Sequence, residues 1–107
     1  MITAVFTECN GKLIGFSLSG HSDYDESRQD IVCAGISSAL MLTVNTITDF
    51  IKADAKIDVD PENEGYASLL LTAPYNENAV NMIESFYAHL CGIEEDYGQI
   101  KLRKSKI

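Results

Sequence analysis

The longest periodic apolar stretch in the chain follows Asp30, and it constrains the possible folds more than any other segment. Its apolar residues recur at intervals of three and four, which is the spacing of an amphipathic helix. They are Val32, Ile36, Ala39, Leu40, Ile47, Phe50 and Ile51, and Thr43 falls at the same helical spacing. Because Asp30 is a favoured N-cap residue, we predict a helix from there to about Lys52. Met41, Leu42 and Val44 lie off the stripe, so a second helix or a partner subunit should cover another side of this helix.

Two segments ahead of this helix predict a β-hairpin. The runs Ile2–Thr7 and Lys12–Ser19 alternate apolar with other residues, and Asn10-Gly11 lies between them. Asn-Gly is typical of a two-residue hairpin turn, because both turn positions require a positive φ. The hairpin should therefore present one apolar face to a core.

A second hairpin is expected after the helix. Lys56–Val59 alternates as a short strand, a cluster of turn residues occupies positions 60–65, and Tyr66–Ala73 reads as the returning strand. Pro74 then ends the strand pattern, because proline cannot donate to a β-ladder.

The remaining residues predict a second helix and a last strand. Asn76 or Asn78 can cap the helix, Gly92 fits the position that ends it, and His89 would lie near its end. Residues 97–103 alternate as a final strand. The order is β-β-α-β-β-α-β, which indicates a single α+β domain over residues 1–107, with a mixed or antiparallel sheet and two helices.

Composition narrows the functional classes. The chain has 107 residues and 46% hydrophobic content, as expected of one globular domain. We find neither a signal-peptide pattern nor an apolar run near the ~20 residues of a membrane span, so we expect a cytoplasmic protein without a membrane partner. The net charge of −8 argues against direct nucleic-acid binding, although four of the eight basic residues crowd the C-terminus.

The cysteines suit free thiols. Cys9, Cys33 and Cys91 are odd in number and form no CxxC pair, so a disulfide framework is not indicated. Only His21 and His89 could join them as nitrogen ligands, and no spacing matches a zinc site. We therefore expect neither a metal nor a cofactor.

One cysteine is placed for nucleophilic chemistry. If Asp30 caps the helix, Cys33 lies in its first turn, where the dipole favours a thiolate and unpaired N–H groups can hold an oxyanion. His21, twelve residues earlier, is the nearest candidate base. Asp30 or Ser37 can orient the histidine or support the loop between them. A buried cysteine that packs as a small hydrophobe is the structural alternative.

These residues resemble a known family. Gly20-His21, then Asp30-Ile31-Val32-Cys33-Ala34, then Ser37 is similar to the signature of the ribosomal-processing cysteine proteases, the Prp family, and the length and element order agree. The resemblance implies a small cytoplasmic α+β protease, usually a homodimer. Its substrate would be the short N-terminal extension of large-subunit ribosomal protein twenty-seven.

The resemblance also assigns roles to residues. Cys33 would be the nucleophile and His21 the base, with Gly20, Asp30 and Ser37 in supporting positions. The segment between the dyad residues, positions 22–29, would cover the substrate. Members of the family commonly have glycine at the position of Arg28. This difference affects how the segment closes over the substrate, and it does not affect the roles of Cys33 and His21.

Two other functions fit the same residues. A ribosome-associated, dimeric binding protein would use His21 and Cys33 only for packing. A redox sensor would use Cys33 because a thiolate at a helix start also reacts with peroxide. Alanine variants of both residues distinguish these functions from proteolysis.

Overall fold

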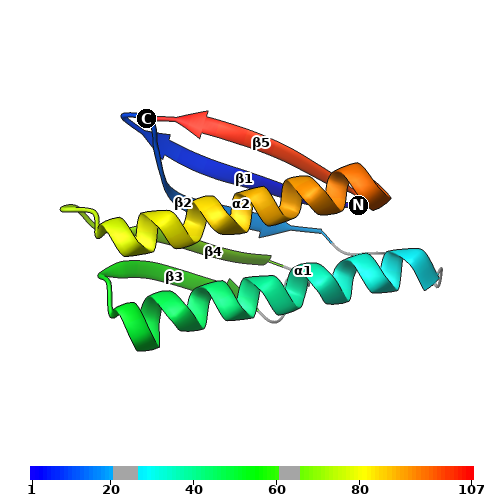
Figure 1. Cartoon of the computed structure of the whole chain (residues 1–107), viewed down its shortest axis with the longest axis horizontal. Coiled ribbons are helices and arrows are strands. Elements are labelled where there is room, and N and C mark those ends of the chain that lie inside the picture. Colours follow the sequence, from blue (N-terminus) through cyan, green and yellow to red (C-terminus); the bar gives the residue numbers. More distant parts are fainter. Residues whose placement is uncertain (21–26, 61–65) are drawn as a thin grey trace.

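A five-stranded mixed sheet carries the helices on one face (Figure 1). The computed structural model describes residues 1–20, 27–60 and 66–107. The elements are β1 (Ile2–Cys9), β2 (Lys12–Ser19), α1 (Ser27–Asn45), η1 (Thr46–Ile51), β3 (Ala55–Asp60), β4 (Tyr66–Leu71), α2 (Glu77–Tyr97) and β5 (Ile100–Lys106). The strand order is β3-β4-β2-β1-β5, with β5 parallel to β1 and the other pairs antiparallel. This confirms the α+β class and the order of elements.

The first hairpin follows the prediction from its turn sequence. Asn10 has φ 51° and Gly11 has φ 80°, so both turn positions are left-handed as the Asn-Gly pair indicates. Across the strands Phe6 pairs with Phe16, and both rings are buried on the face that the helices cover. The hairpin therefore supplies the centre of the core.

Helix α1 begins one turn earlier than predicted. Its first residue is Ser27, so Asp30 lies inside the first turn and is not the N-cap. Arg28 and Gln29 have good helix propensity, which extends the helix into a segment whose charge suggested a loop. At the other end the chain continues as the π-helix η1, and Lys52 with φ 59° ends it, close to the predicted position.

Helix α2 also differs from prediction at one end. The Asn76 side chain accepts a hydrogen bond from the Ala79 N–H at 3.1 Å, which confirms one of the two expected caps. Gly92 does not end the helix, which continues to Tyr97 and is capped by Gly98 with φ 70°. The cost of a helical glycine is only about 1 kcal/mol, and Ile93 beyond it packs against the core. The last strand consequently begins at Ile100.

The apolar character of α1 and η1 corrects the expectation that no apolar run in the chain approaches the length of a membrane span. Residues Ile31–Ile51 are long and apolar enough to cross a membrane by length and composition, with a mean hydropathy of 1.7. Length and hydropathy do not distinguish such a span from a core helix, and Val32, Ile36 and Ile47 of this segment are buried against the sheet and α2. Since only 22% of the segment is buried, much of its apolar surface remains exposed.

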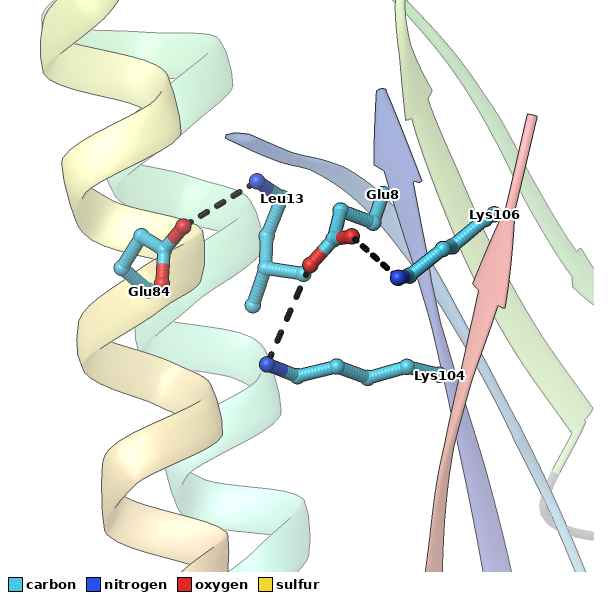
Figure 2. Close-up of polar contacts among 5 residues, drawn as sticks. All are labelled: Glu8, Leu13, Glu84, Lys104 and Lys106. Atoms are coloured by element: carbon cyan, nitrogen blue, oxygen red, sulfur yellow. Dashed lines mark hydrogen bonds and ion pairs between the residues drawn. The ribbon is translucent and has the colours of Figure 1, made fainter. Parts of the chain in front are cut away.

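The carboxylates of Glu84 and Glu8 connect α2 and β5 to the first hairpin (Figure 2). The Glu84 Oε1 atom of α2 accepts a hydrogen bond of 3.1 Å from the Leu13 backbone N–H, beside a register shift between Thr7 and Glu8. Glu8 lies 4.0 Å from Lys104 Nζ and 3.9 Å from Lys106 Nζ. These contacts therefore join the first hairpin, α2 and β5 at one end of the sheet.

Replacing Glu84 with alanine is expected to lower the free energy of unfolding by about 1–3 kcal/mol, because it leaves the Leu13 N–H without its acceptor. Chemical denaturation measures this loss. Glu77→Ala is the matched control, since Glu77 is exposed in the first turn of the same helix. Equal midpoints for the two variants would contradict a stabilising role for the Glu84 hydrogen bond.

Candidate active site

The Cys33 thiol lies on the sheet side of α1. It is free, half-buried and packed against the hydrophobic core, as are Leu40 and Val44 further along the helix. These three residues follow one stripe of the helix, since spacings of seven and four return to the same side. Cys33 is therefore held by packing while its side chain keeps some access to solvent.

The early start of α1 changes the expected electrostatics. Because the helix begins at Ser27, Cys33 lies beyond the first four residues, whose N–H groups lack helical partners. The helix dipole also falls off within the first turn. The prediction that N–H groups of residues 31–33 form the oxyanion site is therefore wrong.

Two of the predicted supporting residues share the helix with the thiol. Asp30 and Ser37 lie three residues before and four after Cys33, so their backbone positions fall on the same side of α1. Ser37 is exposed, which leaves its hydroxyl accessible to solvent. The structure thus brings Asp30, Cys33 and Ser37 together on one helix face by backbone position.

Gly20 occupies a position that requires glycine. Its φ is +92°, and an added Cβ would lie 2.4 Å from the Met1 carbonyl oxygen. The residue ends β2 and passes the chain to His21, which lies outside the described residues together with positions 22–26. Gly20 therefore fixes the point from which the histidine segment leaves the sheet.

Replacing Gly20 with alanine is expected to lower the free energy of unfolding by about 2 kcal/mol, because both the positive φ and the contact with Met1 oppose a side chain. Urea unfolding measures this loss. Gly92→Ala is the control, because a Cβ there meets no atom within 4 Å inside a helix. A Gly20 variant as stable as wild type would refute this role.

A groove runs between α1 and α2 on the other side of α1 from Cys33. Its volume is about 450 Å³. It is lined by Gly35, Ser38, Ala39, Leu42, Thr43, Met82, Ser85, Phe86 and His89. His89 thus lies in the middle of α2, not near its end as predicted from Gly92. Of the α1 residues that lie off the predicted stripe, Leu42 lines this groove and Met41 and Val44 do not.

The other two cysteines lie beside tyrosines. Partial burial raises the pKa of Tyr87, and a hydrogen bond with Cys91 makes a smaller contribution in the same direction. Burial also raises the pKa of Tyr75, with a smaller contribution from Cys9. Neither cysteine shares a helix face with Asp30 or Ser37. Among the residues that the structure describes, no three His, Cys, Asp or Glu side chains are grouped to hold a metal.

The whole length of the chain matches known proteins. The family model for cysteine protease Prp matches residues 1–101. The ribosomal processing cysteine protease Prp of Staphylococcus aureus is 32% identical over 100 residues, covering 92% of this chain and 93% of that protein. The Prp of Bacillus subtilis is 28% identical over 102 residues, covering 91% and 90%.

Solved structures agree with this match. The S. aureus protease Prp in complex with a covalently linked product peptide has 32% identity and a TM-score of 0.86, with 98% of this chain and 100% of that chain covered. The same protease with a substrate peptide has 29% identity and a TM-score of 0.84, with complete coverage of both. On the match over residues 1–101 and these similarities, the chain belongs to the Prp family of ribosomal processing cysteine proteases.

Proposed function

We propose that this cysteine protease removes a short N-terminal extension from large-subunit ribosomal protein twenty-seven, with Cys33 as nucleophile and His21 as base. The observation that carries the proposal is the free, half-buried Cys33 thiol on the helix face shared with Ser37, in a chain that matches the protease family throughout. The names of its relatives as ribosomal processing proteases support the substrate class. The net charge of −8 also favours capture of a basic ribosomal substrate.

In the proposed mechanism His21 accepts the Cys33 thiol proton, and the thiolate sulfur attacks the carbonyl carbon of the scissile bond. The tetrahedral intermediate collapses as the C–N bond breaks, and the imidazolium donates its proton to the leaving amine. The extension stays bound as a thioester. His21 then takes a proton from water, whose oxygen attacks the thioester carbonyl carbon. The C–S bond breaks, the extension leaves as a carboxylic acid, and the imidazolium returns its proton to the Cys33 sulfur.

Ser37 and Asp30 have supporting roles in this proposal. The exposed Ser37 hydroxyl, one turn beyond the thiol, can donate a hydrogen bond to the peptide or to the developing oxyanion. Asp30 lies one turn before the thiol, where a carboxylate can orient an imidazole. In this proposal the Ser37 hydroxyl replaces the N–H groups of the helix terminus as the donor to the oxyanion, because that terminus lies ahead of Cys33.

Mass spectrometry of ribosomal protein twenty-seven from the same organism, with its extension intact, tests the proposal directly. Incubation with the wild-type protease should yield two fragments cut at one junction. Cys33→Ala and His21→Ala should leave the substrate intact while retaining the far-UV circular dichroism of the fold. An uncut substrate after incubation with folded wild-type protein would refute the substrate assignment.

We also propose that the protein is a cytoplasmic homodimer, with the outer face of α1 in the interface. Ile31, Met41, Leu42 and Phe50 of this helical segment are 58%, 63%, 63% and 82% exposed. Large apolar groups gathered on one face favour burial against another protein surface. A second copy of the same uncharged face would cover them symmetrically.

A glutamate at Met41 or Leu42 is therefore expected to convert a dimer into monomers, because an unpaired charge would be buried in the interface. Sedimentation equilibrium measures the change in mass. Tyr97→Glu is the control, since Tyr97 is 46% exposed at the end of α2. A wild-type protein that sediments as a monomer at every concentration would contradict the dimer.

A further inference from the structure

The sheet has one face that no described helix covers. Helix α2 packs on β2 and β5, and α1 lies against α2, so both helices lie on the same face (Figure 1). Side chains alternate between the two faces along each strand. Because Ala4, Leu18 and Leu102 pack in the core, the residues on either side of each of them point to the uncovered face.

Six residues of three neighbouring strands form a patch on this face, which we call the open-face patch. The strand register places Ser19, Thr3 and Lys101 side by side in one row of the patch. The next row contains Ser17, Val5 and Arg103. The patch therefore combines two cationic side chains with three hydroxyl groups and contains no carboxylate.

The two cations of the open-face patch differ from the lysines of β5 on the helix-covered face. Lys104 Nζ lies 4.0 Å from the Glu8 carboxylate and 4.8 Å from the centroid of the Tyr87 ring on α2. Lys101 and Arg103 are exposed, and among the described residues neither has an ion-pair partner. In a chain with a net charge of −8, these two residues leave a local positive site that a polyanion can neutralise.

The composition of the open-face patch indicates the chemistry of its partner. Arginine, lysine and small hydroxyl side chains are typical donors to the phosphate and sugar oxygens of a nucleic acid. The patch contains no aromatic side chain on which an unpaired base could stack, which favours a double-stranded partner over a single strand. Its hydroxyl groups can also bond to ribose 2′-OH groups, which an RNA helix displays in a wide, shallow minor groove.

We propose that the open-face patch binds the sugar–phosphate backbone of double-stranded RNA, with Lys101 and Arg103 on phosphates and the hydroxyls of Thr3, Ser17 and Ser19 on ribose oxygens. The net charge of −8 opposes extensive nucleic-acid binding, so the contact is limited to these two phosphates and is independent of base sequence. Because the patch and α1 lie on opposite faces of the sheet, RNA binding leaves the Cys33 thiol accessible (Figure 1). The contact would hold the protease beside ribosomal RNA.

The salt dependence of binding tests the phosphate contacts. Fluorescence anisotropy of a labelled RNA duplex of about 16 base pairs, titrated with the protein, gives the Kd at several salt concentrations. Two phosphate contacts predict that log Kd rises with the logarithm of the salt concentration with a slope of about 1.8. Lys101→Gln and Arg103→Gln should each lower this slope by about 0.9 and raise the Kd about eightfold near 0.1 M salt. Lys52→Gln is the matched control, because Lys52 is exposed at the end of η1 and the change removes the same charge, and both quantities should stay at their wild-type values.

The hydroxyl contacts need a test that leaves the charges unchanged. Thr3→Val keeps the branched shape of the side chain and removes only its hydroxyl, so the Kd for the RNA duplex should rise about threefold with the same salt slope. A DNA duplex of the same sequence lacks the 2′-OH groups and should bind about tenfold more weakly. Equal affinity for the two duplexes, or displacement of the RNA by polyglutamate of equal total charge, would overturn the assignment to RNA.

Charged side chains on an edge strand can also serve only to prevent pairing with other chains. If Lys101→Gln and Arg103→Gln bound the RNA duplex as tightly as wild type, the two charges would have that protective role alone and the proposal would be wrong. Cleavage of a junction peptide without RNA reports separately on proteolysis, and both variants should cut it at the wild-type rate. Cleavage without RNA binding would overturn this inference and leave the proposed function intact, whereas RNA binding without cleavage would do the reverse.

Discussion

Cys33→Ala is expected to lower kcat/KM for a junction peptide by about 10⁴-fold or more, because no other group on this helix face can form the thioester. The half-buried position of Cys33 tolerates the smaller side chain with little change in packing. Mass spectrometric quantification of the two fragments measures the effect. Cys33→Ser is a second test of kcat/KM, because serine keeps the shape of the side chain and replaces the thiol with a weaker nucleophile.

The other cysteines provide the controls for this variant. Cys9 and Cys91 are also free and half-buried, but they contact Tyr75 and Tyr87 away from the α1 face. Alanine at either position should keep kcat/KM within about twofold of wild type. If the Cys33 variant kept its activity and the Cys91 variant lost it, the nucleophile assignment would be wrong.

Phe6→Ala is expected to have the largest effect on stability. The Phe6 ring is fully buried, and its centroid lies 5.9 Å from that of Phe16, 5.7 Å from Phe86 and 5.0 Å from Tyr87. Truncation should lower the free energy of unfolding by about 4 kcal/mol, from lost burial and the cavity left behind. That is a large part of the 5–15 kcal/mol typical of a domain. Phe6→Leu should cost less and keep a measurable transition.

Chemical denaturation monitored by circular dichroism measures both variants. The neighbouring Val5→Ala is the control, because Val5 is half-buried on the opposite face of the same strand. Its loss should be about 1 kcal/mol. Similar midpoints for the Phe6 and Val5 alanine variants would show that the aromatic cluster does not dominate the core.

Local chemistry allowed much of this fold to be predicted from the sequence. The Asn10-Gly11 turn and the Asn76 cap are determined by residues within four positions of each other. The errors fell where weak local signals compete with tertiary packing. Asp30 is a good cap in isolation, yet the helix begins at Ser27, and Gly92 is a good terminator, yet α2 continues because Ile93 packs against the core.

The candidate site also has a part that follows from local sequence and a part that depends on how distant elements pack. The spacing of Asp30, Cys33 and Ser37 places them on one face of any helix, so their proximity followed from the sequence. The groove beside Met82 depends on how distant elements pack, which periodicity does not encode. The contact between His21 and Cys33 stays a prediction, since His21 lies outside the described residues.

The parallel pairing of β1 with β5 has a consequence for synthesis on the ribosome. Ile2 pairs with Ile100, so one flank of the first strand stays open until β5 has been made. Chains emerge from the amino end, and distant pairings form late because a long loop must close first. A nascent polypeptide that still lacks β5 would therefore have an incomplete sheet, and the protease would mature only after residues Ile100–Lys106 have left the ribosome.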